Sequence, residues 1–346
     1  MADRRVKYRT GHADLDDQIA ALVEAAGVGR DEDLVFEMIV SAVRMGRESA
    51  DRGDLKLVNS TLKELRYSFL VFEPYEEVRK VAIFGSARTK HDDPGYVMAR
   101  DFGRAIVEQD LMVITGAGPG IMEAGIEGAG ADHAFGVNIV LPFESSAAPV
   151  IVGDAKLINY RYFFTRKLTF MKESSAFAVL PGGFGTMDEA FELLTLMQTG
   201  RSPVTPVVLL ESEGSTYWQQ WHAFVEDELA SRGLISASDF AFTKICTTIE
   251  AAVEEVTRFY STFHSYRFVG RRTVVRLERE ISDAELDALN RDFADITLSG
   301  RIERSGPSQP ELDDDDVTDL PRLSFTFDKY SYARLRQLID QLNAGG

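Results

Sequence analysis

The chain has 346 residues, a formal net charge of −17 at pH 7, 45% hydrophobic residues and 27% charged residues. This length allows one large core with smaller appended domains, and this composition is typical of a globular protein that dissolves in water. The acidic balance argues against a surface for nucleic acid, which needs clustered basic side chains. The sequence has one cysteine, no apolar run of membrane-spanning length and no signal-peptide pattern. We therefore expect a cytoplasmic protein with neither a nucleic-acid partner nor a membrane partner.

Residues 1–75 predict a helical N-terminal extension, because their apolar residues recur at helical spacing. The expected helices cover residues 14–26, 31–49 and 54–72. Each begins with an aspartate that can cap the helix and complement its dipole. The extension has no group of residues suited to catalysis, so we interpret it as a packing element or a subunit contact.

From residue 76 onward, short apolar runs alternate with longer amphipathic stretches, which predict buried strands and helices respectively. The expected strands cover residues 81–84, 111–115, 135–141 (closed by Pro142), 156–159, 176–180, 206–211 and 244–247. The expected helices cover residues 94–109, 120–131, 162–173, 187–197, 217–232 and 249–263. Strands that alternate with helices imply a parallel sheet covered on both faces. Residues 76–264 therefore predict an α/β domain with a Rossmann-like, doubly wound parallel sheet.

The last stretch, residues 265–346, predicts a small α+β accessory domain. The expected strands cover 272–277, 296–304 and 323–327, and the expected helices cover 282–293 and 331–342. Ser282 and Glu285 have the spacing of a capping box at the start of the first helix. The acidic run at 313–316 lacks the alternating ligands and the glycine of a calcium loop, so we expect a hydrated loop there.

One stretch of the parallel-sheet domain, residues 181–189, reads PGGFGTMDE. An apolar run leads into it and an amphipathic run leads out, so the predicted order is strand, glycine turn, helix. Glycine allows a ligand to approach the backbone closely, and the free N–H groups of a helix N-terminus bind anions, most often phosphate. Glu189 stands in the first turn of the expected helix, where it either caps that helix or takes part in chemistry.

Two more glycine turns follow expected strands, Gly85-Ser86 after the first and GAGPG at residues 116–120 after the second. Ligands of such sheets bind at the carboxyl ends of the strands, at the topological switch point, so three turns compete for that place. The turn at 116–120 does not match the dinucleotide fingerprint G-x-G-x-x-G, and it has no Walker lysine. The sequence therefore predicts a phosphate site built from glycine turns.

The motif at residues 181–189 fits the pattern P-G-G-x-G-T-x-x-E, and the pair Arg166-Lys167 precedes it on the expected helix. Together with Gly85-Ser86, these residues resemble the LONELY GUY (LOG) family. Members of that family are cytokinin riboside 5′-monophosphate phosphoribohydrolases, often mislabelled lysine decarboxylases.

Two other segments, 118–124 and 138–142, look like the longer bacterial members of that family rather than the short plant type. Glu123 stands where the plant type has a glycine. The resemblance covers about residues 78–259, so it leaves the N-terminal helices and the C-terminal domain outside.

The resemblance implies hydrolysis of the N-glycosidic bond of a nucleoside 5′-monophosphate, such as AMP or an N6-substituted AMP, to free base and ribose 5-phosphate. No metal and no redox cofactor are implied, and the implied assembly is a homodimer with each site near the subunit boundary. The implied catalytic residues are Arg166 and Glu189. The predicted substrate and phosphate-binding residues are Gly85, Ser86, Gly116, Gly118, Lys167, Gly182, Gly183, Gly185 and Thr186.

The chemistry of these residues agrees with the implied reaction. Breaking a ribosyl–base bond builds positive charge on the sugar, which a carboxylate such as Glu189 can stabilise while it positions or deprotonates a water. Arg166 can donate hydrogen bonds but rarely gives up a proton, so we expect it to orient Glu189, the base or the phosphate.

Two other functions compete with this interpretation. A decarboxylase would need pyridoxal phosphate on a lysine, and Lys167 is the only lysine near the central stretch. A non-catalytic nucleotide sensor or carrier on the same fold would need neither Arg166 nor Glu189 in that pairing.

Overall fold

The computed structural model describes residues 8–48, 50–140 and 147–345. The chain divides into two compact units, Met1–Tyr67 and Ser68–Gly346. In the first unit, α1 (Ala13–Ala26) and α2 (Glu32–Arg47) bury a small cluster of apolar side chains against each other, and α3 (Arg52–Phe72) begins. The three predicted N-terminal helices are thereby confirmed, and the expected end of the second helix at Ser49 lies outside the described residues.

The predicted aspartate caps of the first two helices are wrong in detail. The residue before α1 is His12, and Asp31 before α2 makes no capping hydrogen bond through its side chain within the described residues. Asp14 and Asp16 instead lie inside the first turn of α1, where they still complement the helix dipole. Asp16 also accepts a hydrogen bond from the Thr10 backbone N–H at 2.9 Å, which fixes the chain ahead of the helix.

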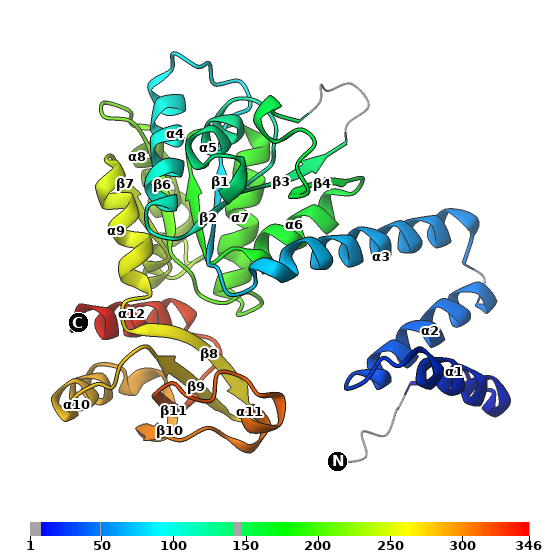
Figure 1. Ribbon diagram of the computed structural model, residues 1–346. Helices are drawn as coiled ribbons and strands as arrows, with labels where there is room; N and C mark the ends of the chain where they lie inside the picture. The colour runs from blue at the N-terminus through cyan, green and yellow to red at the C-terminus, as the bar shows by residue number, and fades with distance from the viewer. Residues whose placement is uncertain (1–7, 49, 141–146, 346) are drawn as a thin grey trace. The chain divides into compact units, whose positions relative to one another are not determined.

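Within the described part of the second unit, seven parallel strands form one sheet in the order β4-β3-β2-β1-β5-β6-β7 (Figure 1). The strands are β1 (Lys80–Phe84), β2 (Met112–Thr115), β3 (Ala134–Ile139), β4 (Leu157–Tyr160), β5 (Ala176–Val179), β6 (Val207–Leu210) and β7 (Thr243–Cys246). This confirms the predicted Rossmann-like parallel sheet. The expected end of the third strand at Leu141 and Pro142 lies outside the described residues.

The central strands β1, β2, β5 and β6 are buried at every position, as the continuous apolar runs of the sequence require. The side chains of α6 and α7 join the core on one face, and those of α4, α5 and α9 join the core on the other. The helices of this region are α4 (Pro94–Val107), α5 (Ile121–Ala129), α6 (Phe163–Glu173), α7 (Phe184–Gln198), α8 (Tyr217–Phe224) and α9 (Ile249–Phe259). No described helix is long and apolar enough to cross a membrane.

Two of these helices differ from the predicted ranges in ways that matter for the site. Helix α7 begins at Phe184, three residues before the expected start at 187. The stretch expected as one helix over 217–232 is α8 followed by a π-helical segment, Val225–Ala230.

The sheet reverses its direction of growth between β1 and β5. The chain proceeds outward from β1 to β4 and then returns to place β5 on the other side of β1. The backbone N–H of Ser86, after β1, donates to the carbonyl of Pro181, after β5, at 3.2 Å. The first and last of the predicted glycine turns therefore meet at the switch point, where such sheets bind ligands.

The C-terminal region forms an antiparallel sheet of four strands in the order β10-β11-β9-β8, counted over the residues that the structure describes. Its elements are β8 (Phe263–Val269), β9 (Arg272–Leu277), α10 (Asp283–Asp292), β10 (Thr297–Ser305), α11 (Gln309–Asp314), β11 (Arg322–Phe327) and α12 (Tyr332–Ala344). The predicted capping box at the start of α10 is confirmed, since Ser282 Oγ accepts from Glu285 N at 3.2 Å and Ser282 N donates to Glu285 Oε2 at 2.6 Å.

Strand β8 was not predicted: the expected helix ends at Phe263, the expected domain boundary lies near Ser265, and no element is expected over 266–271. Only Phe263 of β8 is fully buried, since β8 is an edge strand whose other side chains are half-exposed. The strand exists through its hairpin with β9, which turns at Gly270 with a φ of +59°. A polar edge strand carries little hydrophobic pattern of its own, so only the pairing identifies it.

The hydrated loop predicted at 313–316 is also wrong. The run begins within α11, and Asp316 accepts hydrogen bonds from Arg276 and Arg267, each at 2.6 Å. The neighbouring Glu311 is fully buried. The end of the acidic segment is therefore bound to the antiparallel sheet by the buried Arg276 and the half-buried Arg267.

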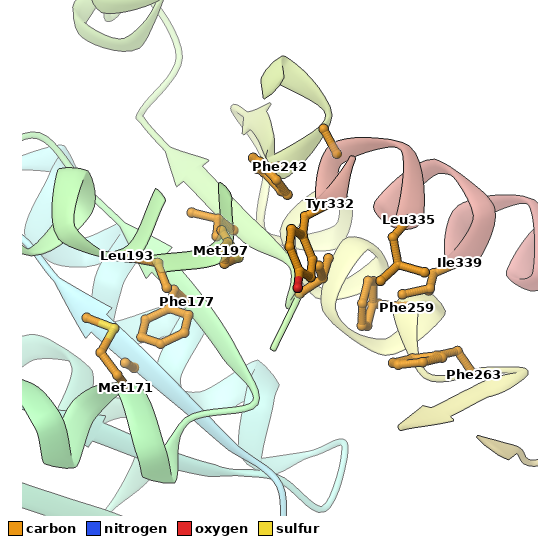
Figure 2. Packing of buried hydrophobic residues seen from close by; sticks show 14 of the residues in the cluster. Met171, Phe177, Leu193, Met197, Phe242, Phe259, Phe263, Tyr332, Leu335 and Ile339 are labelled. Atoms are coloured by element: carbon orange, nitrogen blue, oxygen red, sulfur yellow. The ribbon is translucent and has the colours of Figure 1, made fainter. Parts of the chain in front are cut away.

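The C-terminal helix α12 completes the core of the parallel sheet's α6–α7 face. Figure 2 shows Leu335 and Ile339 of α12 beside Phe259 and Phe263, and Tyr332 next to Met197 of α7. A Cβ on Gly200, which has a φ of +66°, would lie 2.0 Å from the Tyr332 ring, so the end of α7 fits against α12 only with glycine there.

Candidate active site

The turns after β1 and β2 interlock at the carboxyl edge of the sheet. The Ile121 backbone N–H, at the start of α5, donates to the Ser86 carbonyl at 3.1 Å. Gly120 has a φ of +69°, and a Cβ there would lie 2.4 Å from Ser86 O. Glycine is therefore required at 120 for the two turns to approach each other. All three predicted turns meet at this edge.

The glycine turn after β5 leaves the N-terminus of α7 accessible. A Cβ at Gly183 or at Gly185 would meet no described atom within 4 Å, whereas one at Gly182 would lie 2.1 Å from Thr186 Oγ1. The first turn of α7 has no acidic residue, and its N-cap is Gly183, which has no side chain that could cap the first N–H groups. The positive end of the helix dipole is thus left for an anion.

Glu189 does not cap α7. Because the helix begins at Phe184, Glu189 lies in its second turn, and the alternative that it acts as a capping acid is wrong. Its side chain faces inward, with 7% of the residue exposed. A carboxylate placed there, close to an open helix N-terminus and away from water, needs an explanation other than capping.

Arg166 projects from α6 toward the turn after β2. A Cβ on Gly116 would lie 2.6 Å from Nη2 of Arg166, so glycine at 116 provides the room for the guanidinium. The guanidinium carbon lies 5.5 Å from the centre of the Phe170 ring, and only 9% of Arg166 is exposed. A Cβ on Gly118 would likewise lie 2.8 Å from Cε of Met122. The phosphate-binding roles predicted for Gly116 and Gly118 remain predictions.

Lys167 joins α6 to α7 through three carboxylates. Its Nζ lies 2.6 Å from Glu192, 2.7 Å from Asp188 and 3.4 Å from Glu189. Burial alone would lower the pKa of Lys167, but the hydrogen bonds to Asp188 and Glu192 outweigh it and raise that pKa. The ammonium is therefore permanently charged and engaged with α7, and its predicted contact with substrate phosphate remains a prediction.

The environment of Glu189 favours its protonated form more than water does. Burial is the largest influence and raises the pKa of Glu189, while the charges of Lys167 and Arg166 lower it without cancelling the effect. Its Oε2 is buried and receives no hydrogen bond from the described residues, although Lys167 lies within ion-pair distance. A desolvated carboxylate with a raised pKa is a stronger base than a carboxylate in water, which suits it to accept a proton.

Sequence reasoning missed several side chains of this edge. Asp188 and Glu192 could have been found, because they lie one residue before and three residues after Glu189 on a predicted helix. Tyr217, whose hydroxyl donates to the Gly182 carbonyl at 2.6 Å, carries no sequence signal. The described residues contain no cluster of three or more His, Cys, Asp or Glu side chains that could hold a metal ion.

Residues 119–256 match the family model described as "Possible lysine decarboxylase". A probable cytokinin riboside 5′-monophosphate phosphoribohydrolase of Oryza sativa subsp. japonica is 32% identical over 142 residues, which cover 40% of this chain and 60% of that relative. A cytokinin riboside 5′-monophosphate phosphoribohydrolase of Rhodococcoides fascians is 28% identical over 181 residues, which cover 51% of this chain and 89% of that relative. The chain spans 60%, 63% and 65% of the length of three rice relatives.

Among solved structures, the molybdenum cofactor carrier protein of Chlamydomonas reinhardtii is similar over 52% of this chain and 97% of its own, with 17% sequence identity. The TM-score is 0.38, which is too low to support an inference about this chain. The residues that match the family model lie within the region of the parallel sheet. Neither the N-terminal helices nor the antiparallel sheet lies within the matched family residues.

Proposed function

We propose that this chain, which belongs to the LOG (possible lysine decarboxylase) family, hydrolyses the N-glycosidic bond of a nucleoside 5′-monophosphate. The observation that carries the proposal is Glu189, a buried carboxylate with a raised pKa that lies beside Arg166 and Lys167 and close to the open N-terminus of α7. The named relatives support the reaction class.

In the proposed reaction a water oxygen attacks C1′ of the ribose while the bond from C1′ to the base nitrogen breaks. Glu189 stabilises the positive charge that develops on the sugar and takes a proton from the water. The departing base takes up a proton from solvent and Glu189 afterwards releases one to solvent, so the products are free base and ribose 5-phosphate. Arg166, always protonated, orients the carboxylate or the substrate by hydrogen bonds.

The phosphate group of the substrate is proposed to bind at the glycine turn. The backbone N–H groups of Gly183, Gly185 and Thr186 lie at the start of α7, where the helix dipole favours an anion. Gly85 and Ser86 lie on the adjoining turn at the switch point. The substrate class we propose is AMP or an N6-substituted AMP, because the relatives named above act on cytokinin riboside 5′-monophosphates.

We also propose a homodimer formed through α6. Its inner side buries Phe170 and Met171 in the core, whereas Phe163, Phe164 and Leu168 are 51%, 49% and 50% exposed. Three large apolar side chains exposed on one helix that also carries Arg166 mark an interaction surface. Two-fold pairing is the commonest solution for such a surface.

The reaction is tested by incubating the protein with AMP, an N6-substituted AMP, GMP, CMP, UMP and adenosine, and by measuring released base chromatographically. We expect adenine or N6-substituted adenine from the monophosphates and little base from adenosine. Equal rates on AMP and adenosine would contradict the phosphate site. Binding of AMP without release of any base would instead support the alternative of a non-catalytic nucleotide-binding module.

A further inference from the structure

The carbonyl of Gly182 accepts a hydrogen bond from outside its own turn. The donor is the hydroxyl of Tyr217, the first residue of α8, at an oxygen–oxygen distance of 2.6 Å. Tyr217 and Gly182 lie on connections that follow two neighbouring strands, β6 and β5. A short, well-formed hydrogen bond therefore ties the glycine turn to the next connection of the sheet.

The start of α8 is itself fixed by a buried carboxylate. Glu211, directly after β6, is fully buried, and its Oε2 accepts from Ser215 Oγ at 2.6 Å and from the Trp218 backbone N–H at 3.1 Å. The Trp218 indole donates to the Leu210 carbonyl at 3.3 Å, and its ring meets the Tyr217 ring edge-on at 4.9 Å. Burying a carboxylate costs free energy unless hydrogen bonds compensate for the lost water. The hydrogen bonds from Ser215 and Trp218 to Glu211 fix the start of α8 and so hold the Tyr217 side chain in place.

A bond to the Gly182 carbonyl determines where the next N–H points. All peptide bonds in the described residues are trans, so the Gly182 carbonyl and the Gly183 N–H lie in one plane and point in opposite directions. Both flanking residues are glycines, which tolerate rotation of that plane better than any other residue. Without an external partner the plane would be free to rotate, and with Tyr217 bound to it the Gly183 N–H is directed away from α8.

We infer that Tyr217 is a positioning residue, which aims the Gly183 N–H at the substrate phosphate by holding the Gly182 carbonyl. This inference rests on the proposed function, because it takes the glycine turn to be the phosphate site. Tyr217 acts through the backbone and does not itself contact the substrate. Its contribution should therefore appear in the binding of phosphate-bearing ligands rather than in the chemical step.

The test is the variant Tyr217→Phe, which removes one oxygen and keeps the ring. The matched control is Tyr260→Phe, because the Tyr260 hydroxyl also donates to a carbonyl at 2.6 Å, that of Ser175 at the opposite edge of the sheet. Binding of ribose 5-phosphate to each protein is measured by isothermal titration calorimetry. For Tyr217→Phe we expect the Kd to rise roughly tenfold, the loss of one well-aligned hydrogen bond at a binding site.

Kinetics with two substrates separate positioning from general damage. In Tyr217→Phe the KM for AMP should rise by about the same factor, with kcat within about twofold, whereas the low rate on adenosine should not change. Equal losses on AMP and adenosine would make Tyr217 merely structural. If Tyr260→Phe raised the KM for AMP as much as Tyr217→Phe does, the effect of Tyr217 would likewise be merely structural.

Calorimetry does not depend on turnover, so the two proposals fail separately. If the wild type binds ribose 5-phosphate and Tyr217→Phe binds it equally well, the positioning role is overturned even when AMP is hydrolysed. If Tyr217→Phe weakens binding but the wild type releases no base from any nucleotide, the positioning role stands and the proposed reaction falls. A melting temperature within a few degrees of the wild type confirms that the variant is folded.

Discussion

Two buried glutamates have opposite electrostatic environments. Glu189 lies at the carboxyl edge of the parallel sheet, and Glu311 lies in α11 of the C-terminal region. Glu311 accepts hydrogen bonds from the Ser308 backbone N–H at 2.9 Å, from the Ser308 hydroxyl at 2.8 Å and from the Arg276 guanidinium at 3.0 and 3.1 Å. Glu189 has Lys167 at 3.4 Å, and its Oε2 receives no hydrogen bond from the described part of the chain.

The pKa values of the two carboxyls move in opposite directions for this reason. Burial alone would raise the pKa of Glu311, but the hydrogen bonds from Ser308 and Arg276 and the charge of Arg322 together lower it. For Glu189 burial prevails and the pKa is raised. A buried carboxylate with complete partners is a structural device, whereas one with incomplete partners beside an open helix N-terminus is a candidate for chemistry.

The largest effect is expected for Glu311→Gln. The substitution takes the carboxylate from the buried Arg322 and leaves Arg276 with Asp316 alone, so the free energy of unfolding should fall by about 3 kcal/mol. Chemical denaturation measures this change. The matched control is Glu303→Gln in the same sheet, since that residue is 56% exposed and 3.7 Å from Arg272, and it should cost at most about 1 kcal/mol.

Acidification should reduce the difference between the wild type and Glu311→Gln. The folded-state pKa of Glu311 lies below its ordinary value of 4.5, so its stabilisation is fully present above pH 4.5 and is lost as the pH falls through the folded-state pKa. A stability difference that stays constant on acidification would contradict the assigned direction. Turnover of the folded Glu311→Gln protein should equal that of the wild type.

The next largest effect is expected for Glu189→Gln, and it should appear in turnover rather than in stability. Loss of one electrostatic stabiliser should lower kcat by roughly a hundredfold or more, with nucleotide binding retained. Glu192→Gln is the matched control, because Glu192 lies on the same helix and binds the same Lys167 at 2.6 Å. Comparable losses of kcat in both variants, or near-normal turnover in Glu189→Gln, would contradict the proposed catalytic role of Glu189.

The smallest effect is expected for Lys167→Met, which changes the pKa of Glu189 without replacing Glu189 itself. After burial, the Lys167 charge is the largest influence on the pKa of Glu189, and it lowers that pKa. Without this charge the pKa should rise further, so the acidic limb of kcat/KM against pH should shift upward by about one unit. Lys172→Met, on the same helix and paired with Glu173, should leave the limb in place. An unchanged limb in both variants would show that Lys167 does not control Glu189.

The parallel sheet could be predicted closely from the sequence because its constraints are local. A strand covered on both faces must be apolar at every position, so residues 81–84 and 176–180 were recognisable and correspond to β1 and β5. A turn that admits a ligand at a helix N-terminus needs glycine, which made residues 182–185 recognisable as well. The candidates Arg166 and Glu189 came from the family motif around that turn.

What the sequence left undetermined depends on contacts with other elements. Strand β8 exists through pairing with β9, and Asp316, at the end of the acidic run, is bound by Arg267 of β8 and Arg276 of β9. A half-exposed edge strand has little hydrophobic pattern of its own, even though its partner β9 is the next strand in the chain. The aspartates have no local pattern that distinguishes them from a loop, because the arginines that bind Asp316 lie 40 and 49 residues away.

The site shows the same division. The sequence by itself determined that a glycine turn, a carboxylate at 189 and a basic pair at 166–167 would follow one another along the chain. Only the tertiary structure decided that Glu189 lies beyond the first turn of α7, that Lys167 joins α7 rather than solvent, and that Tyr217 holds the Gly182 carbonyl. Burial and ion pairing set the charge state of a carboxylate, and both arise only when separate elements pack together.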